Sequence, residues 1–310
     1  MQSLSIIVPC FNEAKNIAHF YNAMIGEKWR EMISDYEMIF VDDGSTDSTI
    51  SEIQKLKKID KNIRLIKFSR NFGKESAMLA GLKASQKSLI TLMDCDLQDP
   101  PNLLVRMLEI HKANNGNIKM IVAKRANRNG EGKIRAFFSE IFYKVNNALS
   151  PVKIISGVRD FRLMEREVVE AILSMNEYHR FSKAIFEFVG FEKQYLEYEY
   201  VARESGESKW SFVKLLRYGL GGIISFSITP LRAITIIGFV IFALSTLWGS
   251  YILIKALIFG DPVKGYPSLM VLISFLGGLQ IIMLGIIGEY IGRIYEQGKA
   301  RPHYIVEWEK

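Results

Sequence analysis

The 310-residue sequence has few of the residues that form covalent or metal cross-links. Only two cysteines are present, Cys10 and Cys95, and both fall in segments predicted to be buried strand or strand end. This excludes a disulfide framework and indicates a reducing compartment. The four histidines lack the spacing of metal ligands, so we expect no zinc site. Because the amino terminus has no basic start, long apolar stretch or cleavage site, it is not a signal peptide, and the N-terminal part should remain cytosolic.

The sequence also lacks the glycine-rich loops that usually bind phosphate. It contains neither Gly-x-Gly-x-x-Gly nor Gly-x-x-x-x-Gly-Lys-Ser/Thr, so backbone amides of those loops cannot hold a nucleotide. The formal net charge of +7 still favours an anionic partner, which could be nucleic acid, acidic lipid or a phosphorylated substrate. No nucleic-acid recognition motif or basic arm is visible, and we expect no nucleic-acid partner.

Long uncharged runs are absent from the first two-thirds of the chain, but two follow residue 230. Ala233–Ile254 has no charge across 22 residues and Tyr266–Gly288 none across 23, enough in each case to cross a hydrocarbon core of ~30 Å. The outer flanks of these runs are rich in lysine and arginine, which predicts that both are cytoplasmic. The pattern predicts a transmembrane hairpin. The alternative is a pair of very hydrophobic core helices in a soluble protein.

The segment just before the hairpin has a mixed character. Between Trp210 and Ile228, apolar residues alternate with Lys214 and Arg217, which is typical of an amphipathic helix lying at a membrane interface. By periodicity alone a buried core helix is the alternative.

Earlier in the chain, short apolar runs alternate with segments of helix length, which indicates an α/β fold with a largely parallel sheet. In such sheets ligands bind beyond the carboxyl ends of the strands. Polar clusters at Asn12-Glu13, Asp42–Ser45 and Asp94–Asp96 follow three of these runs and predict a site there. The strand-like runs are Leu4–Val8, Met38–Val41, Ile63–Phe68, Leu89–Met93 and Met120–Ala123.

The Asp94-Cys95-Asp96 cluster has the composition of a metal site. Alternate residues of an extended chain point to one side, so Asp94 and Asp96, with Gln98 two residues further on, form an oxygen-rich set suited to Mg²⁺ or Mn²⁺ bridging a diphosphate. An isolated Asp-x-Asp pair also occurs in solvated turns, but the missing phosphate loops favour a metal. We expect Asp42 to contact the nucleoside, and Ser45 or Thr46 can cap the next helix, with capping the favoured role for Ser45.

Four blocks in this order resemble the inverting GT-A glycosyltransferases of family 2: Ile7–Glu13, Val41–Asp47, Arg70–Lys74 and Asp94–Pro101. Two more, Gly157–Leu163 and Arg203–Trp210, are similar to those of polyprenyl-phosphate hexosyltransferases such as dolichol-phosphate mannosyltransferase. The terminal hairpin most resembles that of bactoprenol glucosyltransferases involved in O-antigen modification of lipopolysaccharide, through Pro230–Arg232, Gly265–Ser268 and Gly288–Arg293.

The resemblance covers nearly the whole chain and implies its organisation. It predicts a cytosolic, Rossmann-like GT-A domain at 1–209, the amphipathic segment at 210–228, a transmembrane hairpin at 229–292 with helices near 233–254 and 266–288, and a cytosolic tail at 293–310. The protein would be a multi-pass protein of the cell inner (plasma) membrane with both termini in the cytoplasm, and a homo-tetramer.

The resemblance also implies roles for single residues. Pro9, Glu13 and Asp42 would line the nucleoside pocket, with Asp94 near the ribose. Asp96 and Gln98 would hold the metal, and Asp160 would lie near the reacting centre. The basic positions would face phosphates: Arg125 and Arg135 the acceptor, Arg203 and Lys209 the donor diphosphate. The alternatives are ordinary ones, in which Pro9 ends a strand, Glu13 serves a helix N-terminus and the arginines lie on the surface.

The expected reaction is transfer of glucose from a UDP-sugar to undecaprenyl phosphate, with inversion. Mannose from GDP-mannose, galactose or a modified arabinose would use the same scaffold. The acceptor phosphate is largely ionised near neutral pH, with a second pKa near ~6, so no strong base is required. A processive polysaccharide synthase would carry Gln-x-x-Arg-Trp and more membrane helices, and neither is present. Intact Asp94, Asp96 and Lys209 oppose an inactive membrane scaffold.

Overall fold

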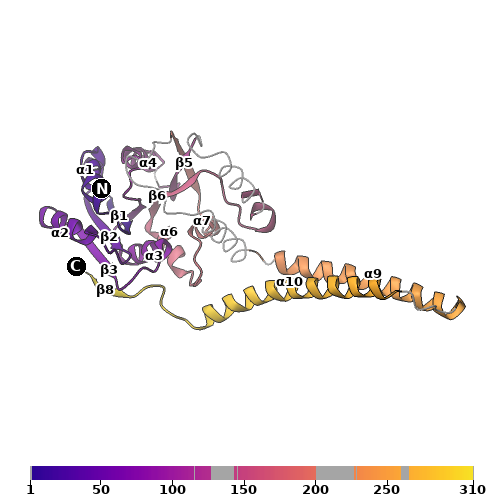
Figure 1. Ribbon diagram of the computed structural model, residues 1–310. Coiled ribbons are helices and arrows are strands. Elements are labelled where there is room, and N and C mark those ends of the chain that lie inside the picture. The colour runs from indigo at the N-terminus through magenta and orange to yellow at the C-terminus, as the bar shows by residue number, and fades with distance from the viewer. Residues whose placement is uncertain are drawn as a thin grey trace.

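The computed structural model describes residues 2–114, 116–126, 143–144, 146–199, 227, 229–259 and 265–309. It has two visibly different parts, a domain built on a β-sheet and a long pair of helices that projects away from it (Figure 1). The predicted amphipathic segment 210–228 lies outside the described residues except for Ser227, and most of the loop after Ala126 lies outside them too.

The sheet is mixed and has the strand order β7-β5-β6-β4-β1-β2-β3-β8. Its central strands β1 to β4 are parallel, while β6 lies antiparallel between β4 and β5, and β8 antiparallel on β3. The predicted α/β sheet is confirmed, and all five strand-like runs are strands. The strands are Ser3–Cys10 (β1), Asp35–Asp42 (β2), Ile63–Phe68 (β3), Leu89–Leu92 (β4), Met120–Arg125 (β5), Val158–Glu165 (β6), Lys193–Tyr198 (β7) and Val306–Glu309 (β8).

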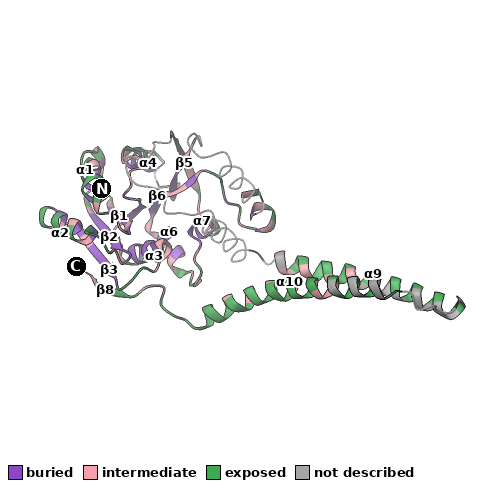
Figure 2. Cartoon of the chain, viewed as in Figure 1, coloured by how far each residue is buried: buried purple, intermediate pink, exposed green. Residues whose placement is uncertain are grey.

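Helices cover both faces of the sheet, so its strands are the most buried part of the domain (Figure 2). Alternation along β1 shows how both faces are filled, since Ile6 packs in one apolar cluster with Phe40 and Ile7 in another with Met78. The helices of the domain are Ala14–Ile25 (α1), Thr49–Ile59 (α2), Lys74–Ala84 (α3), Asn102–Ala113 (α4), Arg166–Ser174 (α6) and Ser182–Phe188 (α7), with a 3₁₀ helix at Lys28–Met32.

The two long helices, Thr229–Phe259 (α9) and Tyr266–Gly298 (α10), lie side by side in opposite directions (Figure 1). Large apolar side chains on them face outward; Phe239 is 73% exposed and Ile281 71%. Among the described residues, Phe275–Gly298 is the one stretch long and apolar enough to cross a membrane, and Leu231–Ile241 is a shorter apolar helix. An outward apolar surface of this extent is stable only when lipid or another protein covers it. The structure thus shows a helical hairpin with one membrane-length apolar helix.

The base of the hairpin is bonded to the sheet domain. The hydroxyl of Thr229 donates to the carbonyl oxygen of Leu149 at 2.7 Å, and the Ser227 hydroxyl donates to the same oxygen. Tyr290, on α10, donates its hydroxyl to the carbonyl oxygen of Ser227 at 2.7 Å. These bonds fix the start of α9 and the opposite stretch of α10 against residues 146–149.

Beyond α10 the chain returns to the sheet. The segment 293–310, predicted as a tail, contains the last turns of α10 and the edge strand β8. The ring of Tyr304 stacks on that of Phe68 with centroids 4.8 Å apart, and Ser69 N donates to Ile305 O at 3.0 Å. The end of the hairpin is therefore held against β3 by backbone pairing and an aromatic contact.

Candidate active site

The three polar clusters predicted to form a site do lie at one edge of the sheet. Strands β1, β2 and β4 are parallel neighbours, and Cys10 at the end of β1 is in register with Asp42 at the end of β2. The backbone N–H of Met93, just before Asp94, donates to Ile7 O at 3.0 Å. Parallel pairing therefore brings the residues after each strand to the same edge.

Asp42 has the environment of a ligand-binding carboxylate. It is fully buried, and one oxygen, Oδ2, accepts a hydrogen bond from Ser45 N at 3.1 Å. Its other oxygen, Oδ1, is buried without a hydrogen-bond partner among the described residues. Burial raises the pKa of Asp42. Because an unsatisfied buried oxygen is costly, a donor from a bound molecule would stabilise this side chain.

Its neighbour Asp43 holds the loop that leads to α3. The two carboxylate oxygens accept hydrogen bonds from Phe72 N at 2.6 Å and Gly73 N at 2.9 Å, and burial raises the pKa of Asp43 to about 6. Gly44 has a φ of +71°, and a Cβ there would lie 2.5 Å from the carbonyl carbon of Arg70. The glycine is required because the two loops touch at this point, and their contact fixes the first turn of α3.

The prediction that Ser45 caps the next helix is wrong. Its hydroxyl instead accepts a hydrogen bond from Asn12 N at 2.9 Å, which ties the loop after β2 to the loop after β1. The start of α2 is bonded by Asp47, whose Oδ1 accepts from Thr49 N at 3.0 Å. The position of Ser45 in the sequence did not reveal this hydrogen bond, because its partner Asn12 belongs to the loop after β1.

Pro9 and Glu13 flank the same loop. Pro9 is half-buried within β1, opposite Val41 in register. Glu13 is half-buried directly before α1 and makes no side-chain cap bond there. Its carboxylate accepts from Asn16 Nδ2 at 2.6 Å, and its backbone N–H donates to Thr49 Oγ1 at 2.9 Å. Pro9 lies beside the end of β2 and Glu13 beside the start of α2, and their predicted contact with a nucleoside stays a prediction.

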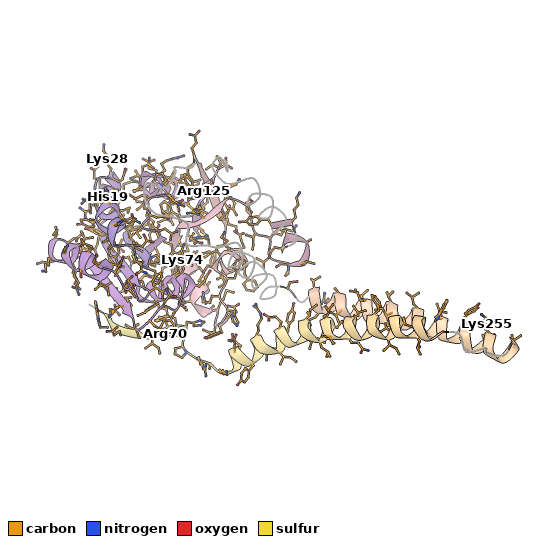
Figure 3. All side chains as sticks on the ribbon, viewed as in Figure 1. His19, Lys28, Arg70, Lys74, Arg125 and Lys255 are labelled. Atoms are coloured by element: carbon orange, nitrogen blue, oxygen red, sulfur yellow. The ribbon has the colours of Figure 1, made fainter. Side chains whose placement is uncertain are left out.

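Lys74 is the residue that the sequence reasoning missed. Its Nζ lies 2.8 Å from Asp94 Oδ1 and 2.7 Å from Asp160 Oδ2, so one ammonium joins two of the predicted site carboxylates. Lys74 is labelled in Figure 3. Burial lowers the pKa of Lys74, but the charges of Asp160 and Asp94 outweigh it and raise that pKa. Burial likewise raises the pKa of Asp160, and Lys74 and Lys183 outweigh it and hold that pKa well below its usual range. Lys74 therefore keeps Asp160 ionised, whereas burial outweighs the same ammonium at Asp94 and raises the pKa of that carboxyl.

Arginines surround the turn after Asp96. The Oδ1 of Asp96 accepts from Gln98 N at 3.2 Å. The side-chain oxygen of Gln98 accepts from Arg125 at 3.1 Å and from Arg159 at 3.4 Å. Arg159 also pairs with the buried Asp99 at 3.2 Å. The structure thus brings Arg125, predicted for the acceptor phosphate, beside Gln98, predicted for the metal.

The donor set suits a divalent ion only in part. Within the described residues, no group of three His, Cys, Asp or Glu side chains is placed to hold a metal ion. Burial raises the pKa of Asp94, and the nearby charge of Asp96 raises it further. One or two carboxylates plus substrate phosphates are a common ligand set for Mg²⁺. The carboxylates fit an ion that arrives with a nucleotide, whereas Gln98 would have to exchange its bonds to the arginines. Arg135, Arg203 and Lys209 lie outside the described residues.

The sequence matches two known protein families. Residues 5–173 match the family described as glycosyl transferase family 2, and residues 229–294 match the family described as GtrB C-terminal hairpin. The bactoprenol glucosyl transferase of Shigella phage SfV is 42% identical over 308 residues, 99% of each chain. An uncharacterized glycosyltransferase of Synechocystis sp. is 40% identical over 303 residues, covering 98% of this chain and 94% of its own. These matches confirm the family resemblance inferred from the sequence blocks.

Among solved structures, the mannosyl-3-phosphoglycerate synthase of Rubrobacter xylanophilus superposes with a TM-score of 0.50 at 15% identity. The superposition covers 76% of this chain and 75% of that one. At this identity the likeness shows a common fold, in accord with the mixed sheet described above.

Proposed function

Because the chain belongs to glycosyl transferase family 2 and is a glycosyltransferase, we propose that it transfers glucose from UDP-glucose to undecaprenyl phosphate, a polyprenyl phosphate. The observation that carries the proposal is the match over 99% of the chain to a bactoprenol glucosyl transferase, with the sheet domain and the hairpin both included. Mannose, galactose or a modified arabinose is the alternative sugar. The product would be a lipid-linked donor for O-antigen or another surface glycan.

The donor nucleotide is proposed to bind at the carboxyl ends of β1, β2 and β4. The unsatisfied Oδ1 of Asp42 supports this, because a ribose hydroxyl or base N–H would complete its hydrogen bonding. Pro9 and Glu13 would line the same site, and Asp94 would face the ribose. Arg203 and Lys209 are proposed for the donor diphosphate.

A divalent ion, Mg²⁺ or Mn²⁺, would be held by Asp96 with Asp94, and with Gln98 after it exchanges partners. When bound, such an ion neutralises charge on the leaving diphosphate. The chain's own cations add to this, because an anionic acceptor must approach an anionic donor. Arg125 and Arg135 are proposed to hold the acceptor phosphate.

Direct attack by the acceptor oxygen on the anomeric carbon forms one C–O bond as the bond to the diphosphate breaks, which inverts the centre. Asp160 is proposed to lie near this carbon, where a carboxylate stabilises positive charge developing on the sugar. Lys74 supports that role by holding Asp160 ionised and in place.

The hairpin is proposed to cross the inner membrane twice and to keep the sheet domain and both termini in the cytoplasm. The outward apolar surfaces of α9 and α10 support this, and Lys255 lies toward the end of the hairpin remote from the sheet domain (Figure 3). The same surfaces would serve in the homo-tetramer that the resemblance implies, which mass photometry in nanodiscs would test.

The direct test incubates the purified full-length chain in nanodiscs containing undecaprenyl phosphate with UDP-glucose, UDP-galactose or GDP-mannose. We expect glucose transfer with Mn²⁺ or Mg²⁺ and inverted anomeric configuration by NMR. Asp96→Asn is the inactive control. Transfer to a soluble sugar but never to the lipid phosphate would contradict the acceptor assignment, and preference for another nucleotide sugar would correct the donor.

A further inference from the structure

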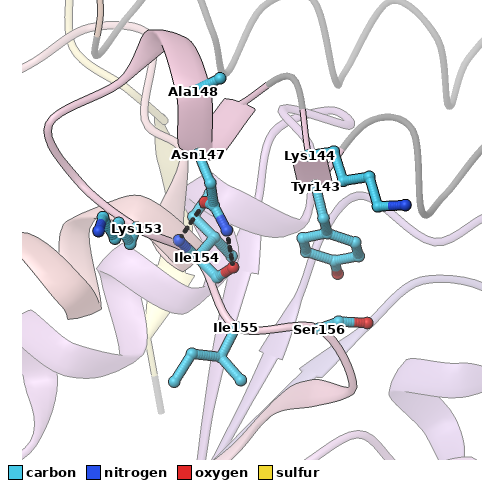
Figure 4. Close-up of a pocket in the computed structure, with 8 residues that line it drawn as sticks. All are labelled: Tyr143, Lys144, Asn147, Ala148, Lys153, Ile154, Ile155 and Ser156. Atoms are coloured by element: carbon cyan, nitrogen blue, oxygen red, sulfur yellow. Dashed lines mark hydrogen bonds between the residues drawn. The ribbon is translucent and has the colours of Figure 1, made fainter.

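A cavity of about 640 Å³ lies between the helical residues 143–144 and 146–149 and the chain that leads into β6 (Figure 4). Apolar groups make up most of its lining, from Tyr143, Ala148, Ile154 and Ile155. Two lysines, Lys144 and Lys153, complete it together with small polar groups. Its volume is within the range of small-molecule sites, about 300–1,000 Å³.

The cavity walls are fixed to each other by a pair of side-chain bonds. Asn147 Nδ2 donates to Ile154 O at 3.0 Å, and Ile154 N donates to Asn147 Oδ1 at 2.8 Å, as the dashed lines in Figure 4 show. Behind them, Ile154 packs with buried Phe181 and with Tyr143. These contacts hold the cavity open as a formed feature of the surface.

Its position links the membrane hairpin to the catalytic groups. At one end, Leu149 O accepts the hydroxyl of Thr229, the first residue of α9. At the other end, Ser156 precedes Gly157, whose carbonyl accepts from Arg125 N at 3.0 Å. Strand β6 then carries Asp160. The cavity lies along the chain between the base of the hairpin and the residues proposed for acceptor phosphate and reaction.

The chemistry of the lining selects an amphiphilic anion. Ile155 is 38% exposed in the cavity wall, which is unfavourable in water unless an apolar group covers it. Lys144 and Lys153 are exposed beside the apolar surface and supply positive charge for an anionic head group. A hydrophilic nucleotide would leave this apolar lining uncovered.

We propose that this cavity binds the phosphate-proximal isoprenoid units of the acceptor lipid, with Lys144 and Lys153 adding positive charge that draws the lipid phosphate toward Arg125. The identity of the lipid rests on the proposed function. Each CH₂ group buried there adds about 0.8 kcal/mol of favourable transfer free energy, so a few isoprenoid units are enough to hold the lipid end near Arg125.

Photo-crosslinking tests the site without requiring sugar transfer. The full-length chain in nanodiscs would be irradiated with a diazirine-bearing farnesyl phosphate and the labelled peptides identified by mass spectrometry. We expect labelling within 143–156, competed by undecaprenyl phosphate and not by phosphatidylglycerol. Equal competition by phosphatidylglycerol, or labelling confined to other segments, would overturn the proposal.

Variants make the test quantitative. Ile155→Ser and the double variant Lys144→Glu/Lys153→Glu should each lower labelling at least tenfold and raise the acceptor KM by a similar factor, with the KM for nucleotide sugar unchanged. Ile59→Ser, at an isoleucine 76% exposed on α2, is the matched control and should change neither. Unaltered labelling and KM in both cavity variants would refute the site.

The two proposals fail in different ways. Specific labelling at 143–156 without any glycosyl transfer would reject the proposed reaction and leave the lipid site standing. Efficient transfer to undecaprenyl phosphate with no labelling there would reject the lipid site and leave the reaction standing.

Discussion

Replacing Lys74 by methionine removes the ammonium that is paired with both Asp94 and Asp160 while keeping most of the side-chain volume. The two carboxylates, 2.8 and 2.7 Å from Nζ in the intact protein, would then repel each other with less positive charge to compensate them. Asp94 also faces Asp96 and Arg159, and Asp160 faces Lys183 and Arg162. Arg159 also attracts both acids, but it is paired with Asp99 at 3.2 Å, so it compensates them less than Lys74 does. We therefore expect each acid to move away from its present position.

The size of the effect follows from the geometry. Two unit charges ~4 Å apart at an effective dielectric constant near 20 attract by about 4 kcal/mol. The side chains of Lys74, Asp94 and Asp160 are 36%, 26% and 23% exposed, so water screens each pair and a smaller value applies. If each of the two pairs contributes about 1–2 kcal/mol of interaction free energy to the transition state, kcat/KM should fall about 100-fold, since 1.36 kcal/mol is a factor of ten.

The assay is steady-state transfer by the full-length chain in nanodiscs. Lys74→Arg keeps the charge and should recover much of the lost kcat, which separates a charge effect from a packing effect. Lys119→Met is the matched control, because Lys119 also joins two carboxylates, Glu165 at 2.8 Å and Glu167 at 2.9 Å, away from the site. A Lys74→Met variant within threefold of the wild type would refute the reasoning.

Three further predictions concern the metal and the loops around the site. Asp96→Asn should abolish Mn²⁺-dependent transfer and leave the melting temperature unchanged. It should also weaken Mn²⁺ binding, measured by electron paramagnetic resonance with UDP present, and undiminished Mn²⁺ binding would contradict the metal role. Gly44→Ala should destabilise the fold by more than about 3 kcal/mol in denaturant unfolding, because its Cβ would clash with Arg70. Gly73→Ala, also at positive φ but with open space around it, should destabilise it by about 1–2 kcal/mol. Equal destabilisation by the two variants would argue against the clash. The pKa of Asp43 is raised to about 6 in the folded chain, so the folded state binds more protons than the unfolded one between about pH 4 and 6, and the free energy of unfolding should fall as the pH rises through that window. Asp43→Asn should flatten this slope, and an unchanged slope would assign it to other groups.

The strands predicted from the sequence are those buried on both faces. A parallel strand such as Ile63–Phe68 or Leu89–Leu92 shows up as an apolar run because helices cover the sheet on both sides. Strand β6 does not form an apolar run, since it carries Arg159, Asp160 and Arg162, which are stabilised by partners from other elements. Arg162 is fully buried, and its guanidinium donates to the carbonyl oxygens of Asp160 and Arg159.

The residues of the candidate site also differ in how far local sequence could identify them. Asp94 and Asp96 follow a strand and belong to a short motif, so local sequence was enough to identify them. Lys74 belongs to the block Arg70–Lys74, but its partners lie 20 and 86 residues away in sequence, and no periodicity links them. The only local signal was a lysine at the start of a helix after a glycine, where a positive charge is unfavourable unless carboxylates compensate it.

The edge strand β8 changes how the hairpin relates to the rest of the chain. Because β8 pairs with β3 after α10, the hairpin is an insertion between two parts of one sheet, and the sheet can be completed only after the hairpin has been synthesised. During translation the outer edge of β3 therefore stays unpaired, with backbone groups that can recruit other chains, until the membrane helices have left the ribosome. A soluble form of the catalytic domain should accordingly be made by joining residue 227 to residue 299 through a flexible linker, since cutting the chain before α9 also removes the strand that closes the sheet.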